Sequence, residues 1–124
     1  MKLVSASKKV LITGIDSFTG NHLSSYLQVN GYDVHGTSFF SEYTKIYKCD
    51  ITKKEDIQRV LQIVNPDFII HLSGISFTAH GKSEDFYKVN TIGTMNILVT
   101  LIDLDINPSK VILASSATIY GNQG

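Results

Sequence analysis

The sequence predicts an α/β protein in which short parallel strands alternate with helices around one sheet. Short apolar runs recur along the chain, as in Val10-Leu11-Ile12 and Phe68-Ile69-Ile70, and such runs are typical of strands covered on both faces. Helical patterns lie between these runs, and a glycine-bearing turn, Thr13–Gly20, joins the first strand to the first helix. With 124 residues the chain is expected to form a single domain.

The first half of the chain supplies three strands and two helices. Strands are expected at Lys9–Thr13, Asp33–Ser38 and Lys45–Cys49, with Phe39–Thr44 as a loop. The first helix begins at about Phe18, and spacing of i, i+3, i+4 predicts its buried stripe, formed by Leu23, Tyr26 and Leu27. The second helix is opened by Thr52 and Glu55, which have the spacing of a capping box.

The second half continues the alternation. A strand is expected at Phe68–Ser73, a long helix from Glu84 to about Leu104, and a fifth strand at Lys110–Ser115. Crossovers between parallel strands are right-handed, which predicts a three-layer Rossmann-type fold with sheet order 3-2-1-4-5 and a ligand crevice at the carboxyl ends of strands one and four. The chain stops nine residues after the fifth strand, so the sheet is expected to be truncated there.

The turn after the first strand is the candidate phosphate site. Gly14 permits a tight turn, and Gly20 allows the helix to pack closely against its strand. The middle position holds Ser17, whose hydroxyl could itself donate to a phosphate oxygen. Backbone N–H groups and the helix dipole favour an anion at this point. A plain strand-to-helix turn remains the alternative.

Composition excludes several other classes of protein. Eleven Lys and Arg residues balance eleven Asp and Glu residues, which gives no electrostatic reason to expect nucleic acid or a membrane as partner. Cys49 is the single cysteine, as suits a reducing compartment, and the expected location is the cytoplasm. The four histidines show no metal-ligand spacing, so no metal site is expected.

Five segments, in this order and spacing, resemble the extended short-chain dehydrogenase/reductase family, especially its sugar-nucleotide epimerases, dehydratases and reductases. They are Thr13–Leu23, Cys49–Ile51, His71–Gly74, Val89–Asn96 and Ser115–Gly121. The resemblance covers nearly the whole chain, from Lys9 onward, and identifies residues 1–124 as an NAD(P)-binding Rossmann domain without the family's substrate domain.

The resemblance implies a role for each matching residue. Asp50 and Ile51 would contact the adenine, Asn90 would lie behind the site, and Ser116 would be the catalytic residue that hydrogen-bonds the reacting substrate oxygen. The residues implied at the pyrophosphate and the adjoining ribose are Gly14, Ser17, Phe18, Gly20, Ser73 and Gly74.

Two departures from the family narrow the activity. The family's dehydratases carry an Asp-Glu pair where this chain has Ala117 and Thr118, which lack acid–base capacity at neutral pH. The family's Tyr-x-x-x-Lys pair is absent. The expected function is therefore the NAD(P)-binding portion of a nucleotide-sugar epimerase or ketoreductase that transfers hydride at a sugar carbon. The alternative is a non-catalytic dinucleotide-binding sensor or scaffold.

The end of the second strand bears on the choice of cofactor. It carries no acidic side chain of the kind that binds the ribose of NAD, whereas Thr37 and Ser38 could hydrogen-bond a 2′-phosphate. The sequence therefore favours NADP over NAD. The partner expected for the whole enzyme is a nucleotide-sugar. The isolated chain is expected to be inactive and to self-associate, as a homodimer, through the uncovered edge Lys110–Ser115.

Overall fold

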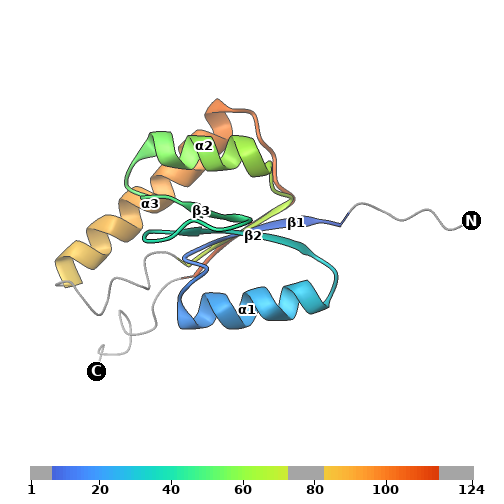
Figure 1. Ribbon diagram of the computed structural model, residues 1–124. Helices are drawn as coiled ribbons and strands as arrows, with labels where there is room; N and C mark the ends of the chain where they lie inside the picture. The colour runs from blue at the N-terminus through green and yellow to red at the C-terminus, as the bar shows by residue number, and fades with distance from the viewer. Residues whose placement is uncertain (1–6, 73–82, 115–124) are drawn as a thin grey trace, which may run out of the picture.

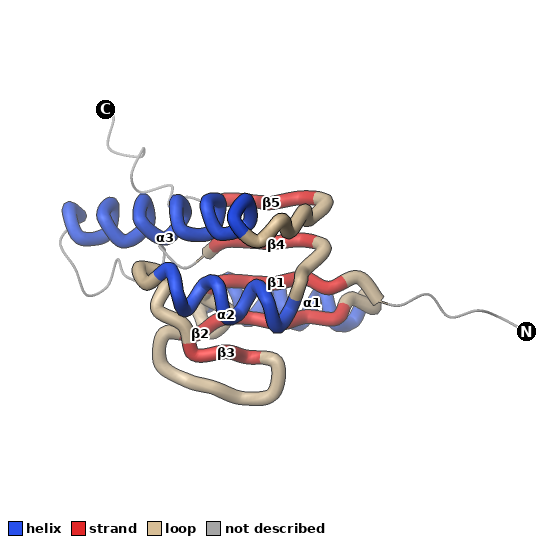
Figure 2. Tube along the Cα trace, turned by 90° about the horizontal axis from the view of Figure 1, so that it is seen from above, coloured by secondary structure: helices blue, strands red, loops and turns tan. Residues whose placement is uncertain are grey.

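A computed structural model describes residues 7–72 and 83–114, and all of the fold reported below lies in these two ranges. The elements are β1 (Lys9–Thr13), α1 (Phe18–Val29), β2 (Asp33–Ser38), β3 (Ile46–Lys48), α2 (Lys54–Val64), β4 (Phe68–His71), α3 (Ser83–Asp103) and β5 (Lys110–Leu113). The strands form one parallel sheet in the order β3-β2-β1-β4-β5, as Figure 2 shows. The predicted fold class and strand order are confirmed.

The molecule has three layers. Helix α1 lies on one face of the sheet, and α2 and α3 lie together on the other (Figure 1). The register pairs Thr13 of β1 with Thr37 of β2 and with His71 of β4. The carboxyl ends of three neighbouring strands therefore meet at one edge, next to the start of α1.

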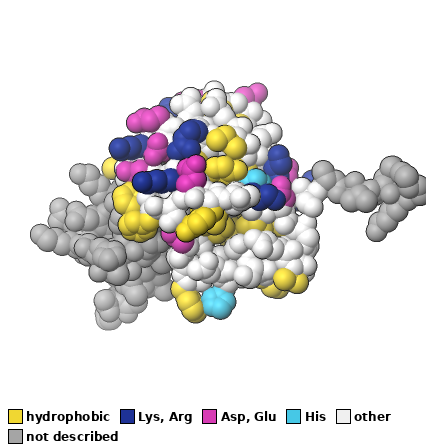
Figure 3. Space-filling view, viewed as in Figure 1, with side chains coloured by type: hydrophobic (Ala, Val, Ile, Leu, Met, Phe, Trp, Pro, Cys, Tyr) yellow, Lys and Arg dark blue, Asp and Glu magenta, His cyan; other side chains and the backbone are white. Residues whose placement is uncertain are grey.

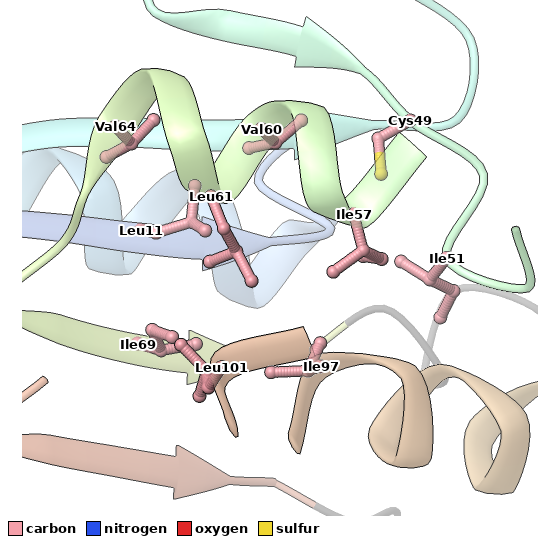
Figure 4. Packing of buried hydrophobic residues seen from close by; sticks show 10 residues of the cluster. All are labelled: Leu11, Cys49, Ile51, Ile57, Val60, Leu61, Val64, Ile69, Ile97 and Leu101. Carbon is pink, nitrogen blue, oxygen red and sulfur yellow. The ribbon is translucent and has the colours of Figure 1, made fainter. Parts of the chain in front are cut away.

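Apolar side chains fill both interlayer spaces. The larger cluster lies between the sheet and helices α2 and α3 (Figure 4) and contains Leu11, Cys49, Ile51, Ile57, Val60, Leu61, Val64, Ile69, Ile97 and Leu101. The smaller cluster lies on the α1 side and contains Val10, Ile12, Ile15, Val34 and Leu72. Adjacent residues of β1 thus point to opposite faces, as the twofold repeat of a strand requires.

Two expected details of the helices are wrong. Tyr26 is 66% exposed rather than buried, because α1 turns its small residues Gly20 and Ser24 to the sheet. Helix α2 begins at Lys54 with Lys53 as N-cap and no side-chain cap. The hydroxyl of Thr52 instead donates to Asp50 Oδ1 at 2.6 Å, because a Thr side chain can satisfy a nearby turn in place of the helix.

Strand β3 is shorter than the predicted Lys45–Cys49. Lys45 has a φ of 64°, a left-handed conformation that a strand cannot include. Strands β4 and β5 end at His71 and Leu113, before the expected ends.

Side chains of both charges are intermixed on the face that carries α2 (Figure 3). None of the helices in the described ranges has the length and apolar character needed to cross a membrane.

Candidate functional site

Hydrogen bonds between residues of the turn itself hold the turn between β1 and α1. Gly14 has a φ of 70°, which favours glycine. Ser17 caps the helix: its Oγ accepts from the N–H of Gly20 at 3.0 Å and donates to the carbonyl of Gly14 at 2.8 Å. The only proton of this hydroxyl is thus used within the turn, so it is not free to donate to a phosphate as the sequence suggested.

Gly20 leaves no room for a side chain. A Cβ added there would lie 2.5 Å from the carbonyl oxygen of Gly14 and 2.7 Å from that of Ile15. Both obstructing atoms belong to the backbone of the turn, which is itself held because the N–H groups of Gly14 and Ile15 both donate to Thr37 O at 3.1 Å. Only glycine lets the helix start this close to the strand.

The start of α1 carries backbone N–H groups that have no acceptor inside the helix. Phe18 and Thr19 are the first two helical residues, and N–H groups at these positions have no acceptor within a helix. The Phe18 side chain is 81% exposed and meets the ring of His22 edge-on, with centroids 4.5 Å apart. This end of the helix is therefore open on one side and suited to an anion.

The end of β2 differs from what the sequence suggested. Thr37 is only 2% exposed and Ser38 only 1%. The side chain of Thr37 borders a small void between the sheet and α2. Ser38 Oγ donates to Asp16 Oδ2 at 2.6 Å. Neither hydroxyl is presented to solvent, where a 2′-phosphate would approach.

Asp50 and Ile51 follow β3 and occupy distinct environments. Asp50 Oδ1 accepts from the N–H of Thr52 at 3.0 Å as well as from its hydroxyl, which fixes the carboxylate in orientation. Ile51 is buried, and its carbonyl accepts from Asn96 Nδ2 of α3 at 2.8 Å. Its side chain occupies the space left by Gly93. The loop after β3 is thus anchored to α3.

A cavity of about 550 Å³ opens beside Asp50, between the loop after β2 and the start of α2. Its lining is aromatic at one end and charged elsewhere, with residues Phe39, Phe40, Glu42, Lys48, Asp50, Lys53, Asp56 and Arg59. Phe39 and Phe40 meet edge-to-face, with ring centroids 5.1 Å apart. The cavity offers an aromatic wall and a fixed carboxylate, a combination suited to a planar base that carries an amino group.

His71 lies inside the sheet, at the end of β4. Its side chain is 1% exposed, and burial lowers the pKa of the imidazole to about 4. The ring is therefore neutral at pH 7. Burial likewise raises the pKa of the Cys49 thiol to about 12, so this cysteine carries no thiolate reactivity.

The structure brings part of the predicted site together. Gly14, Ser17, Phe18 and Gly20 form the turn and helix start described above, and Asp50 borders the cavity. Asn90 is a half-buried residue of α3. Ser73, Gly74 and Ser116 lie outside the described residues.

Sequence reasoning missed two residues, Thr19 and Asp16. Thr19 could have been found from its place in the first helical turn. Asp16 is brought to β2 by a contact between residues 22 positions apart, which no local pattern reveals.

The sequence matches a known protein family over most of its length. The sequence profile of the NAD-dependent epimerase/dehydratase family matches residues 10–124. A GDP-6-deoxy-D-talose 4-dehydrogenase from Aggregatibacter actinomycetemcomitans is 37% identical over 93% of this chain and 37% of its own length. A UDP-glucose 4-epimerase from Pisum sativum is 26% identical over 96% of this chain and 39% of its own.

A solved structure extends the likeness to the fold. The UDP-glucose 4-epimerase of Thermotoga maritima superposes with a TM-score of 0.71 at 23% identity, over 88% of this chain and 38% of that one. The chain thus spans about two fifths of the length of the relatives it matches. The profile match and the 37% identity together show that the chain belongs to the NAD-dependent epimerase/dehydratase family.

Proposed function

We propose that this chain binds NAD(P) and forms the cofactor-binding part of a nucleotide-sugar epimerase or ketoreductase. The observation that carries the proposal is the start of α1. There, Gly20 has no space for a Cβ, and the N–H groups of Phe18 and Thr19 lack acceptors within the helix. Such an arrangement suits a pyrophosphate, because N–H groups at a helix start can donate to an anion and the helix dipole adds positive potential.

The substrate class is inferred from relatives, so it belongs to the proposal. The relatives named above are a GDP-sugar dehydrogenase and a UDP-glucose epimerase. Both names place the reaction at carbon 4 of a sugar that is linked to a nucleotide. Ala117 and Thr118 occupy the positions at which the family's dehydratases place acid–base residues, which favours an epimerase or ketoreductase over a dehydratase.

Different residues of this chain would bind different parts of NAD(P). A bound NAD(P) would supply hydride exchange at its nicotinamide ring. The helix start would hold the pyrophosphate, and the second oxygen of Asp50 would accept from the adenine amino group, since Oδ1 is already held by Thr52. Ser116 is proposed to hydrogen-bond the reacting substrate oxygen, Ser73 and Gly74 to line the cofactor near the phosphates and ribose, and Asn90 to lie behind the site.

The experiment that tests binding removes one N–H group and leaves the helix intact. Proline is tolerated at the first helical position, and Ser17 already has the extended ψ of 165° that a following proline requires. Phe18→Pro is therefore expected to fold but to bind NAD(P) about 10- to 100-fold more weakly, the effect of losing one hydrogen bond to a charged group. Isothermal titration calorimetry measures the affinity.

Phe18→Ala is the matched control, because it removes the exposed ring and retains the N–H group. Its affinity should stay within about threefold of the parent chain. Equal losses in both variants would assign the effect to the ring rather than to the backbone donor. Failure of the folded parent chain to bind either dinucleotide would refute the proposed function.

Hydride transfer is the second readout. Reduction of a keto-sugar needs a general acid within hydrogen-bond reach of the oxygen, and the family's Tyr-x-x-x-Lys pair does not occur in these 124 residues. The isolated chain is therefore expected to bind the cofactor without turnover. A spectrophotometric NAD(P)H assay with nucleotide-sugars would detect any activity that contradicts this.

A further inference from the structure

A carboxylate lies at the end of β2 although β2 itself contributes none. Asp16 belongs to the turn after β1, yet its Oδ2 accepts a hydrogen bond of 2.6 Å from Oγ of Ser38, the last residue of β2. The turn is held in this position by Thr37 O, which accepts from two backbone N–H groups of the turn at 3.1 Å. The contact is therefore part of the way the turn docks on the strand.

The hydroxyl of Ser38 is fully used in holding this arrangement. It accepts from the N–H groups of Phe40 and Ser41, both at 3.1 Å, and donates its proton to Asp16. A serine hydroxyl has one proton and two lone pairs, so no capacity remains for a ligand. Asp16, in contrast, is an exposed residue, and among the described residues only its Oδ2 accepts a side-chain hydrogen bond.

The location of the other carboxylate oxygen, Oδ1, suggests its use. In folds of this kind the pyrophosphate lies at the first helix, and an acidic side chain at the end of the second strand accepts a hydrogen bond from the 2′-hydroxyl of the adenosine ribose. Asp16 stands between these two places, two residues before the helix start at Phe18 and bonded to the end of β2.

We propose that Asp16 selects the cofactor and makes this chain prefer NAD over NADP. Its Oδ1 accepts from the ribose 2′-hydroxyl, and its negative charge repels a 2′-phosphate. The inference rests on the proposed function, because it assumes that a dinucleotide occupies the helix start. It also reverses the preference for NADP suggested by the sequence, which depended on hydroxyls that are now seen to be buried.

One feature of the site opposes this inference. The neighbouring cavity carries Lys48, Lys53 and Arg59, which would attract a phosphate. The same lining carries Glu42, Asp50 and Asp56, so its formal charge sums to zero. The carboxylate that Ser38 orients is accordingly expected to decide the preference.

The test compares the affinities of NAD and NADP for the parent chain and for Asp16→Asn, measured by calorimetry. Asparagine keeps the shape and an oxygen acceptor for Ser38 but removes the charge. We expect the parent chain to bind NAD at least tenfold more tightly than NADP, and Asp16→Asn to reduce this ratio by about 10- to 100-fold. Glu55→Gln removes an equal charge from an exposed residue of α2 and should leave the ratio unchanged.

The outcomes distinguish a failure of the role of Asp16 from a failure of dinucleotide binding. Binding of both dinucleotides with a ratio that Asp16→Asn does not alter, or a parent chain that prefers NADP, would overturn the role of Asp16 and leave the proposed function standing. A folded parent chain that binds neither dinucleotide would overturn both. Far-UV circular dichroism of each variant establishes that the proteins compared are folded.

Discussion

Thr13 and His71 are in-register partners on β1 and β4, and Thr13 Oγ1 lies 2.6 Å from His71 Nδ1. The same hydroxyl oxygen accepts from the N–H of Leu72 at 2.9 Å. The other ring nitrogen of His71, Nε2, is buried without a hydrogen-bond partner among the described residues. A proton added to this ring would therefore place a charge where little can solvate it, which is why burial lowers its pKa.

His71 should make the stability of the chain depend on pH. Its pKa falls from 6.5 to about 4 on folding, so between these values the unfolded chain binds more protons than the folded one. The free energy of unfolding therefore decreases as the pH falls from 6.5 to 4, by about 3 kcal/mol at 1.36 kcal/mol per unit of pKa. Urea unfolding at several pH values measures this slope.

The variant His71→Leu removes the titration and should flatten the slope in this interval. His22→Gln is the control, because His22 is an exposed histidine of α1 and its removal leaves the buried ring in place. An unchanged slope in His71→Leu would show that another group causes the acid sensitivity.

Ser17 should contribute to stability through its cap. Ser17→Ala removes the acceptor for the N–H of Gly20 and should lower the free energy of unfolding by about 1 kcal/mol, whereas Ser17→Gly should lower it by a few tenths. Ser25→Ala is the matched control, because this exposed serine lies inside α1, where alanine is the better helix former. Ser25→Ala should be neutral or stabilising; equal losses for Ser17→Ala and Ser25→Ala would argue against the cap.

Gly93 and Ile51 should behave as a coupled pair. A Cβ at Gly93 would lie 2.5 Å from Cδ1 of Ile51, so Gly93→Ala is expected to destabilise the fold by about 1–3 kcal/mol through overpacking. Ile51→Val deletes the obstructing methyl group. In the double variant the loss should be smaller than the sum of the two single losses, by about 1 kcal/mol. Additive losses, measured by urea unfolding, would show that the side chain of Ile51 does not limit the substitution.

The β5 edge should cause self-association of the isolated chain. Ile112 and Leu113 are each 47% exposed, and β5 is an outer strand of the described sheet. Ile112 also borders an apolar groove of about 150 Å³ with Tyr32 and Phe68. We expect a dimer in sedimentation velocity, and Ile112→Lys should weaken it at least tenfold, because it places a charge on the edge. Val29→Lys on α1, where Val29 is 86% exposed, should have no effect; a parent chain that stays monomeric at high concentration would contradict the prediction.

The strands were predictable because a run of apolar and small residues within one short segment indicates each of them. The strands Lys9–Thr13 and Asp33–Ser38 have the predicted bounds. Most of their residues are apolar or small, as burial on both faces of a sheet requires. The buried face of α1 was not predictable from hydrophobic periodicity. Gly20 and Ser24 are buried there because they are small, and the larger Tyr26 is turned outward.

In the candidate site, too, features set by local sequence were predictable, and features set by contacts between distant segments were not. The roles of Gly14 and Gly20 could be predicted, because a tight turn needs glycine at such positions and both glycines can be seen in the sequence. The sequence allowed the hydroxyl of Thr52 either to cap α2 or to bond Asp50. In the structure it donates to the carboxylate of Asp50, and α2 has no side-chain cap. The pairing of Asp16 with Ser38 depends on how two separate segments dock, and this requires the assembled sheet.

The double hydrogen bond to Thr37 O also has a consequence for the order in which the chain folds. Because Gly14 and Ile15 both donate to β2, the turn reaches its final shape only after β1 and β2 have paired across the intervening helix. The proposed dinucleotide site is therefore expected to form late in folding, because it depends on a contact between separate segments. A ligand that binds it stabilises only the assembled β1–α1–β2 unit. It should therefore slow unfolding and leave the folding rate unchanged.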